Sequence, residues 1–262
     1  MSKAAINKLS VSVAMASLFA VTSAQGSLMY SVSGPGEQDA VDAETSFLEN
    51  MMQDGYVTED FNSFEAGTQQ EYFDTSVGTF TGTEAGVDSG ESGNTGLCDE
   101  DENFTCTDGL AVLDNESSPF SGRAPVPDSE DNPNWLDSMD YNEMVFDVAE
   151  GNNAVGFFMT DPDDQGGVMD IRVDGENHEF DLVEDIFGGD RNTGDTFYLS
   201  FWAETDIDSL TFTANNKNDG YGIDNVSVGR VPEPGTLALM GLGLVGLAIS
   251  RRRMGNREQA AA

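Results

Sequence analysis

The sequence predicts an all-β protein: an antiparallel β-sandwich with jelly-roll character and long acidic loops. Many short segments alternate between apolar and polar residues, as in Met169-Asp170-Ile171-Arg172-Val173, and this period of two places the apolar side chains on one face of a strand. Gly, Asn, Asp and Pro interrupt these segments every 8 to 15 residues, which is typical of short antiparallel strands. Sustained helical periodicity is absent.

Ten segments are predicted as strands, and one short helix is predicted at residues 43–53. The clearest hairpin surrounds Asp174-Gly175, because this dipeptide favours a tight turn between two strands. The predicted strands are residues 60–64, 78–83, 110–113, 143–148, 154–160, 168–173, 178–183, 196–203, 209–213 and 222–228.

Polar, Gly- and Pro-rich stretches at residues 84–103 and 115–140 predict long loops. Residues 25–59 show only a weak pattern and are predicted to be a weakly structured N-terminal region. Residues 60–230 are then the β-sandwich ectodomain, which is long enough for one substantial hydrophobic core.

The N-terminus has the features of a secretory signal peptide at residues 1–24. Lys3 and Lys8 precede an apolar stretch at residues 9–21, and Thr22-Ser23-Ala24 supplies small residues for a signal peptidase. An uncleaved membrane anchor is the alternative, but the apolar stretch is short. The sequence therefore predicts export.

The C-terminus is a sorting and transmembrane segment at residues 231–254, followed by a disordered polar tail at residues 255–262. Pro232-Glu233-Pro234 precedes an apolar run at residues 237–249, and Arg251-Arg252-Arg253 follows it. Thirteen helical residues span about 20 Å, short of a bilayer core of about 30 Å, and the flanking small residues and snorkelling arginines nearly close the difference. We expect a single hydrophobic helix.

This tripartite tail resembles the PEP-CTERM sorting domain of Gram-negative bacteria. The resemblance implies that an exosortase recognises the tail and cleaves near the Pro-Glu-Pro tripeptide. It further implies a membrane-anchored intermediate, then a place at the cell surface or in the extracellular matrix, in association with exopolysaccharide or biofilm.

The exported part is extremely acidic. The whole chain has a net charge of −37, and residues 27–230 contain 46 acidic and 5 basic residues, a net charge of −41. Nucleic acid is excluded as a natural partner, because such binding depends on Lys and Arg, and anionic membrane surfaces are disfavoured. The acidity indicates solubility in a saline habitat, divalent-cation binding at a few carboxylates, or both.

Cys98 and Cys106 lie in an acidic loop. An even number of cysteines in an exported chain predicts one local disulfide that closes this loop. A metal site there would need further cysteines or histidines nearby, and the sequence has none.

Three stretches of the body, residues 61–65, 154–162 and 219–228, resemble the β-sandwich ectodomains of PEP-CTERM proteins, which are distantly similar to carbohydrate-binding modules. That resemblance implies a structural Ca²⁺ between Glu65 and Asp224, with Asn225 and nearby carbonyl groups as further ligands. The alternative is that both acids are simply solvated at strand ends. The acidic cluster at residues 161–167 is predicted to be a turn with exposed acids, because Arg172 occupies the position where a calcium loop needs Glu.

Catalysis has little support in the sequence. His178 is the only histidine, it lies in an alternating segment typical of a strand surface, and there is no Gly-x-Ser-x-Gly motif. Trp135, in a predicted loop, and Tyr221, beside the last strand, are candidates for stacking on a sugar ring, whereas Trp202 is assigned to the core.

We therefore expect a non-enzymatic surface or matrix protein that binds glycan or calcium. Its partners would be signal peptidase and exosortase during processing, the membrane before cleavage, and extracellular polysaccharide. The alternatives are a secreted polysaccharide hydrolase and a purely structural or adhesive protein.

Overall fold

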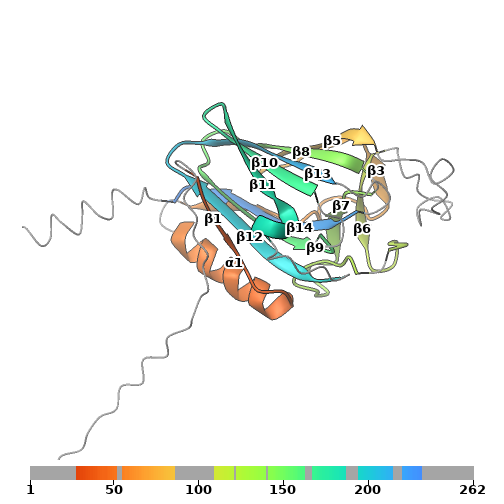
Figure 1. Ribbon diagram of the computed structural model, residues 1–262. Helices are drawn as coiled ribbons and strands as arrows, with labels where there is room; N and C mark the ends of the chain where they lie inside the picture. Colours follow the sequence, from red (N-terminus) through yellow and green to blue (C-terminus); the bar gives the residue numbers. More distant parts are fainter. Residues whose placement is uncertain are drawn as a thin grey trace, which may run out of the picture.

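The structure is a computed structural model that describes residues 28–51, 55–85, 109–120, 122–139, 141–162, 167–186, 194–214 and 220–231. Two antiparallel sheets form two layers, and one helix, α1 (Glu37–Met51), lies against the outside of one of them (Figure 1). The predicted all-β class with antiparallel sheets is confirmed.

The first sheet, sheet A, has eight strands. The sheet order is β1 (Leu28–Val32), β12 (Thr196–Ala203), β9 (Ala154–Thr160), β14 (Gly222–Gly229), β7 (Asn134–Asp137), β6 (Leu110–Asp114) and β3 (Thr68–Gln70), with β2 (Tyr56–Glu59) beside β14.

The second sheet, sheet B, has six strands. Their order is β11 (Glu176–Asp181), β10 (Gly167–Val173), β13 (Ile207–Ala214), β8 (Tyr141–Val148), β5 (Gly78–Ala85) and β4 (Tyr72–Asp74). Burial alternates along β10 and β13, so one face of sheet B packs into the core and the other meets solvent.

Aromatic side chains join the two sheets. Phe157 of β9 meets Phe212 of β13 edge-on, with ring centroids 5.7 Å apart. Tyr30 of β1 packs in the same manner on Phe180 of β11, at 5.0 Å. These rings belong to one large buried cluster, whose removal from water is the main stabilising contribution to the fold.

Helix α1 covers the outer face of sheet A through a second apolar cluster. Phe47 packs on Tyr198 with ring centroids 5.9 Å apart, and a Cβ atom at Gly156 would overlap the Phe47 ring and the Tyr198 hydroxyl. Every residue of β9 is buried, because the core lies on one side of this strand and α1 on the other. That double burial explains the nearly continuous apolar run of residues 154–160.

Several sequence predictions are corrected by the structure. Residues 25–59 were predicted to be weakly structured, yet β1, α1 and β2 lie there and pair or pack with sheet A. The predicted strand at residues 60–64 is a turn after β2, and the predicted loop at residues 115–140 contains β7. Strand β11 ends at Asp181, where a π-helical turn (Leu182–Ile186) begins.

The predicted signal peptide, the C-terminal hydrophobic helix and the polar tail lie outside the described residues. Among the residues that are described, no helix has both the length and the apolar character needed to cross a membrane.

Candidate functional site

The outer face of sheet B carries polar side chains that align in rows across all six strands. Strand pairing sets the rows, because residues opposite one another in register point to the same face. Adjacent strands are separated by about 4.8 Å, and successive side chains on one face by about 6.8 Å. One row contains Tyr72, Thr81, Val145, Thr211, Asp170 and Glu179, and the next contains Asp74, Thr79, Asp147, Ser209, Arg172 and Asn177.

A shallow groove of about 400 Å³ crosses this face over β8, β13, β10 and β11. Val145 is its one apolar lining residue, and the others supply carboxylate, hydroxyl, amide and guanidinium groups. The lining residues are Glu143, Val145, Asp147, Asp170, Arg172, Asn177, Ser209 and Thr211.

Some of the acids on this face are held in place by neighbouring hydroxyl groups. Thr83 donates a hydrogen bond to Glu143 Oε1 at 2.6 Å, and Thr79 donates one to Asp74 Oδ1 at 2.8 Å. Carboxylates accept hydrogen bonds, Arg172 and Asn177 donate them, and hydroxyls do both. The groove can therefore exchange several hydrogen bonds with a ligand that carries many hydroxyl groups.

Tyr72 provides an exposed aromatic ring on the same face. Its side chain is 54% exposed, and it shares a row with Val145, two strands or about 10 Å away. The sequence interpretation overlooked Tyr72. Its signal was the short alternation Tyr72-Phe73-Asp74, in which Phe73 is buried and its two neighbours face solvent.

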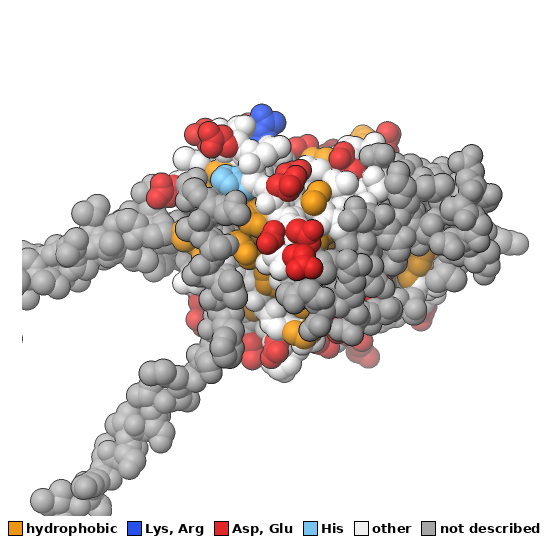
Figure 2. Space-filling view, in the orientation of Figure 1, with side chains coloured by type: hydrophobic (Ala, Val, Ile, Leu, Met, Phe, Trp, Pro, Cys, Tyr) orange, Lys and Arg blue, Asp and Glu red, His pale blue; other side chains and the backbone are white. Residues whose placement is uncertain are grey.

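Acidic side chains greatly outnumber basic ones on the surface drawn in Figure 2. Within the described residues the basic side chains are Arg123, Arg172 and Arg230, and Arg123 is buried. Because so few cations compensate the acids, an anionic polymer would be repelled from most of this surface.

Trp135 and Tyr221 do not form a ligand platform, which corrects the sequence prediction. The Trp135 side chain is fully buried, lies in β7 rather than in a loop, and donates from Nε1 to Asp137 Oδ2 at 3.2 Å. Tyr221 is buried against Phe212, and burial raises the pKa of its hydroxyl. Neither ring has a face open to solvent.

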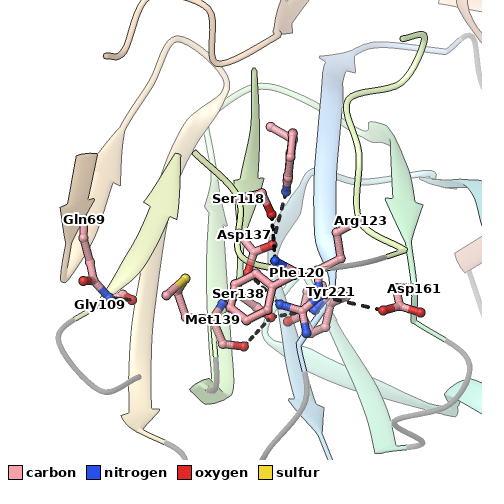
Figure 3. Close-up of polar contacts among 11 residues, drawn as sticks. Gln69, Gly109, Ser118, Phe120, Arg123, Asp137, Ser138, Met139, Asp161 and Tyr221 are labelled. Carbon is pink, nitrogen blue, oxygen red and sulfur yellow. Dashed lines mark hydrogen bonds and ion pairs between the residues drawn. The ribbon is translucent and has the colours of Figure 1, made fainter. Parts of the chain in front are cut away.

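Trp135 is buried beside an ion cluster of Arg123, Asp137 and Asp161, because Asp137 also accepts its hydrogen bond (Figure 3). Arg123 Nη1 donates to Asp137 Oδ1 at 3.0 Å, and its Nε lies 3.8 Å from Asp161 Oδ2. The guanidinium group also sits 4.1 Å from the centre of the Phe120 ring. The cluster ties residues 120–139 to the end of β9. Asp161, predicted to be an exposed turn acid, is instead buried and also accepts a hydrogen bond from Gly194 N at 2.6 Å.

Asp224 is buried among hydrogen-bond donors. Its Oδ2 accepts from Val126 N at 2.8 Å and from Asn132 Nδ2 at 3.1 Å, and its Oδ1 accepts from Asn225 N at 2.7 Å. Burial raises the pKa of this carboxyl, while the three donors oppose the rise. In the native fold Asp224 therefore helps to hold residues 126–132 on sheet A.

Glu65, the other predicted calcium ligand, is exposed in the turn before β3. No cluster of three or more His, Cys, Asp or Glu residues suited to a metal ion occurs within the described ranges. Calcium at Glu65 and Asp224 stays a prediction.

His178 lies on the edge strand β11, partly buried and opposite Ile171. Cys98, Cys106, Pro232-Glu233-Pro234 and Arg251-Arg252-Arg253 lie outside the described residues, so the predicted disulfide stays a prediction.

The class of protein follows from the C-terminal segment of the sequence. The described part of the two-sheet β domain reaches residue 231, and the sequence continues with a Pro-Glu-Pro tripeptide, a short apolar run and an arginine cluster. Residues 230–253 match the PEP-CTERM protein-sorting motif. The chain is therefore an exosortase-sorted exported protein with a membrane-anchored processing intermediate.

Two solved structures show a limited likeness to the chain. The K2 cleaved adhesin domain of Lys-gingipain (Kgp) aligns at 12% identity and a TM-score of 0.37, over 67% of this chain and 100% of that one. The Agl-KA catalytic domain aligns at 14% identity and a TM-score of 0.25, over 67% of this chain and 30% of that one. Scores this low do not establish a common fold or function. Among curated proteins, none matches the chain.

Proposed function

We propose that the exported domain is a non-catalytic glycan-binding module of the extracellular matrix, associated with exopolysaccharide or biofilm. The observation that carries this proposal is the polar groove on the outer face of sheet B, with the exposed ring of Tyr72 in the same strand register. Sheet A differs, because α1 and apolar packing cover much of its outer face.

The spacing of the polar rows suits an extended polymer rather than a small compact ligand. Donors and acceptors repeat about every 4.8 Å across the strands, so a chain lying across them meets a new polar group at each strand. The flat ring of Tyr72 would cover the apolar face of one sugar at the side of the groove, as aromatic rings do in concave ligand sites.

The strand order supports a jelly-roll assignment for this module. The eight consecutive strands β7–β14 divide into the orders β12-β9-β14-β7 and β11-β10-β13-β8. Numbered from one to eight, these orders are 6-3-8-1 and 5-4-7-2, which are produced when four antiparallel strand pairs wrap around a barrel-like core.

The test is binding of the full-length protein in detergent to an array of neutral, cationic and anionic polysaccharides. Tyr72→Ala should weaken binding about 2- to 12-fold, if stacking on a sugar contributes about as much as an aromatic pair, 0.5–1.5 kcal/mol beyond the buried area. Tyr56→Ala is the matched control, because Tyr56 is also an exposed tyrosine but belongs to β2 of sheet A.

Two results would contradict the proposal. The first is the absence of binding to any polysaccharide at millimolar concentrations of that polysaccharide. The second is equal weakening by both alanine variants. Release of reducing sugar from a bound polymer would instead favour the alternative, a secreted hydrolase.

A further inference from the structure

The two ends of the described domain emerge at the same end of sheet A. Leu28, the first described residue, pairs with Ala203 of β12, and Ala154 of β9 pairs with Gly229 of β14. Gly229 also pairs with Tyr56 of β2. Trp202 of β12 pairs with both Met29 of β1 and Ala154. One row across sheet A therefore joins Met29, next to the start of β1, to Gly229 at the end of β14 and to Tyr56 of β2. We refer to this region, with the turns at residues 149–153 and 204–206, as the exit end.

The chain is held firmly where it leaves the exit end. The buried side chain of Asn153 accepts from Val231 N at 2.9 Å and donates to Val231 O at 3.2 Å. Arg230 Nη1 donates to Gly151 O at 2.7 Å and pairs with Asp206 Oδ1 at 2.9 Å. Val231 also packs against the apolar cluster beneath α1. The folded domain therefore extends through residue 231.

Only a short tether separates the folded domain from the apolar segment of the sorting motif. The apolar run begins at Leu237, six Cα steps beyond Val231, and six fully extended steps span at most about 20 Å. While the motif anchors the chain in the membrane, the exit end must stay within roughly this distance of the bilayer.

The exit end also carries most of the exposed large apolar side chains of the described chain. These are Tyr56, 38% exposed, and Val57, 46% exposed, whereas Tyr72 lies on sheet B. Tyr56 and Val57 are paired with Gly229 and Val228, so they lie a few residues from the point where the tether begins. Tyrosine favours the membrane–water interface, because its ring is apolar and its hydroxyl is polar.

We propose that the exposed start of β2, whose consecutive residues Tyr56 and Val57 point to opposite faces of sheet A, rests end-on on the bilayer in the membrane-anchored precursor. The charges of the exit end determine which lipids suit it. Glu150, Glu204 and Asp206 lie in its turns, and Arg230 is its basic group. This excess of acid suits zwitterionic headgroups and opposes anionic ones. Contact at the strand ends leaves the outer face of sheet B open, so the surface is independent of glycan binding.

The proposal can be tested by tryptophan quenching in the full-length protein reconstituted into phosphatidylcholine vesicles with brominated acyl chains. Val57→Trp and Tyr56→Trp report on the exit end, and Tyr72→Trp is the matched control at a somewhat more exposed site on sheet B. The signal of the parent protein, which contains Trp135 and Trp202, is subtracted in each case.

We expect at least twofold stronger quenching at positions 56 and 57 than at position 72, with melting temperatures equal to that of the parent. Equal quenching at all three positions would overturn the proposal. So would quenching at 56 and 57 that is stronger in anionic than in zwitterionic vesicles at low salt, because the acidic turns would then not face the lipid.

Discussion

Glu44, on the sheet-facing side of α1, should destabilise the fold at neutral and alkaline pH. Its carboxyl is partly buried, and burial raises its pKa from an ordinary value of 4.5 to about 7, although a hydrogen bond to Asn225 opposes the rise. The neighbouring Tyr198 hydroxyl is buried, and both burial and the charge of Glu44 raise the pKa of that hydroxyl. The folded state therefore favours the protonated, neutral form of Glu44.

The sign of the pH dependence follows from the raised pKa. The folded chain binds this proton more tightly than the unfolded chain, so the contribution to stability is complete below pH 4.5 and is lost as the pH rises through about 7. A pKa rise of this size corresponds to roughly 3 kcal/mol at 1.36 kcal/mol per pKa unit. Solvent screening of a partly exposed group reduces the effect to about 1–2 kcal/mol.

Glu44→Gln removes the charge but keeps the shape and a hydrogen-bonding amide. We expect the free energy of unfolding of the variant at pH 8 to exceed that of the parent by about 1–2 kcal/mol. For a domain of this size, this corresponds to a rise in Tm of about 3–6 °C. At pH 5 Glu44 is protonated in the fold, and only its ionisation in the unfolded chain still separates the two proteins, so the difference should shrink to below about 1 kcal/mol, or about 2 °C. Thermal denaturation by circular dichroism at both pH values measures this difference.

Glu49→Gln is the matched control, because Glu49 is on the same helix but exposed. It should leave the melting temperature within about 1 °C of the parent at both pH values, as surface substitutions usually do. The reasoning would be refuted if Glu44→Gln stabilised the protein equally at pH 5 and pH 8, or if Glu49→Gln produced the same gain.

Three further predictions concern the ion cluster, calcium and sorting. Arg123→Met should cost about 3–5 kcal/mol in urea unfolding, because Asp137 and Asp161 would stay buried without the guanidinium group; a loss below 1 kcal/mol would contradict this. If Ca²⁺ binds at Glu65 and Asp224, it should raise the Tm beyond ionic-strength-matched sodium in the parent but not in Glu65→Gln, and an identical response of both proteins would exclude the site. Replacing Pro232-Glu233-Pro234 by three alanines should leave export intact but retain an unprocessed form in the membrane of the native host, and unchanged release on immunoblots would contradict the role of the tripeptide.

The strands and the C-terminal sorting motif could be predicted from the sequence because their signals are local. Alternation of polar and apolar residues is a property of consecutive positions, and the predicted bounds of β9 and β12 agree with the structure. The Pro-Glu-Pro tripeptide, the apolar run and the arginine cluster are likewise contiguous, and the match at residues 230–253 confirms the sorting motif. The extreme acidity, from which we predict that nucleic acid is not a partner, needs only a count of charges.

Burial and register could not be predicted in the same way, because they depend on which distant segments meet. Trp135 lies in a polar stretch, yet Asp137 and the segment around Arg123 enclose it. The helix was predicted to begin at residue 43, six residues after its actual start at Glu37. Its apolar face is set by sheet A beneath it and not by a strong periodicity of its own. Tyr72 belongs to a strand of three residues, too short to recognise without its partner β5.

The sequence by itself therefore determined the class of fold, the sorting motif and the charge of the surface, since each is encoded by neighbouring residues or by composition. Only the tertiary structure decided that Trp135 and Tyr221 are buried and that Tyr72 shares a face with the polar groove. It also decided that Asn153 holds Val231 beside the exposed side chains of β2. The physical reason is that exposure and juxtaposition are set by long-range strand pairing and packing, in which each residue contacts others far away in the chain.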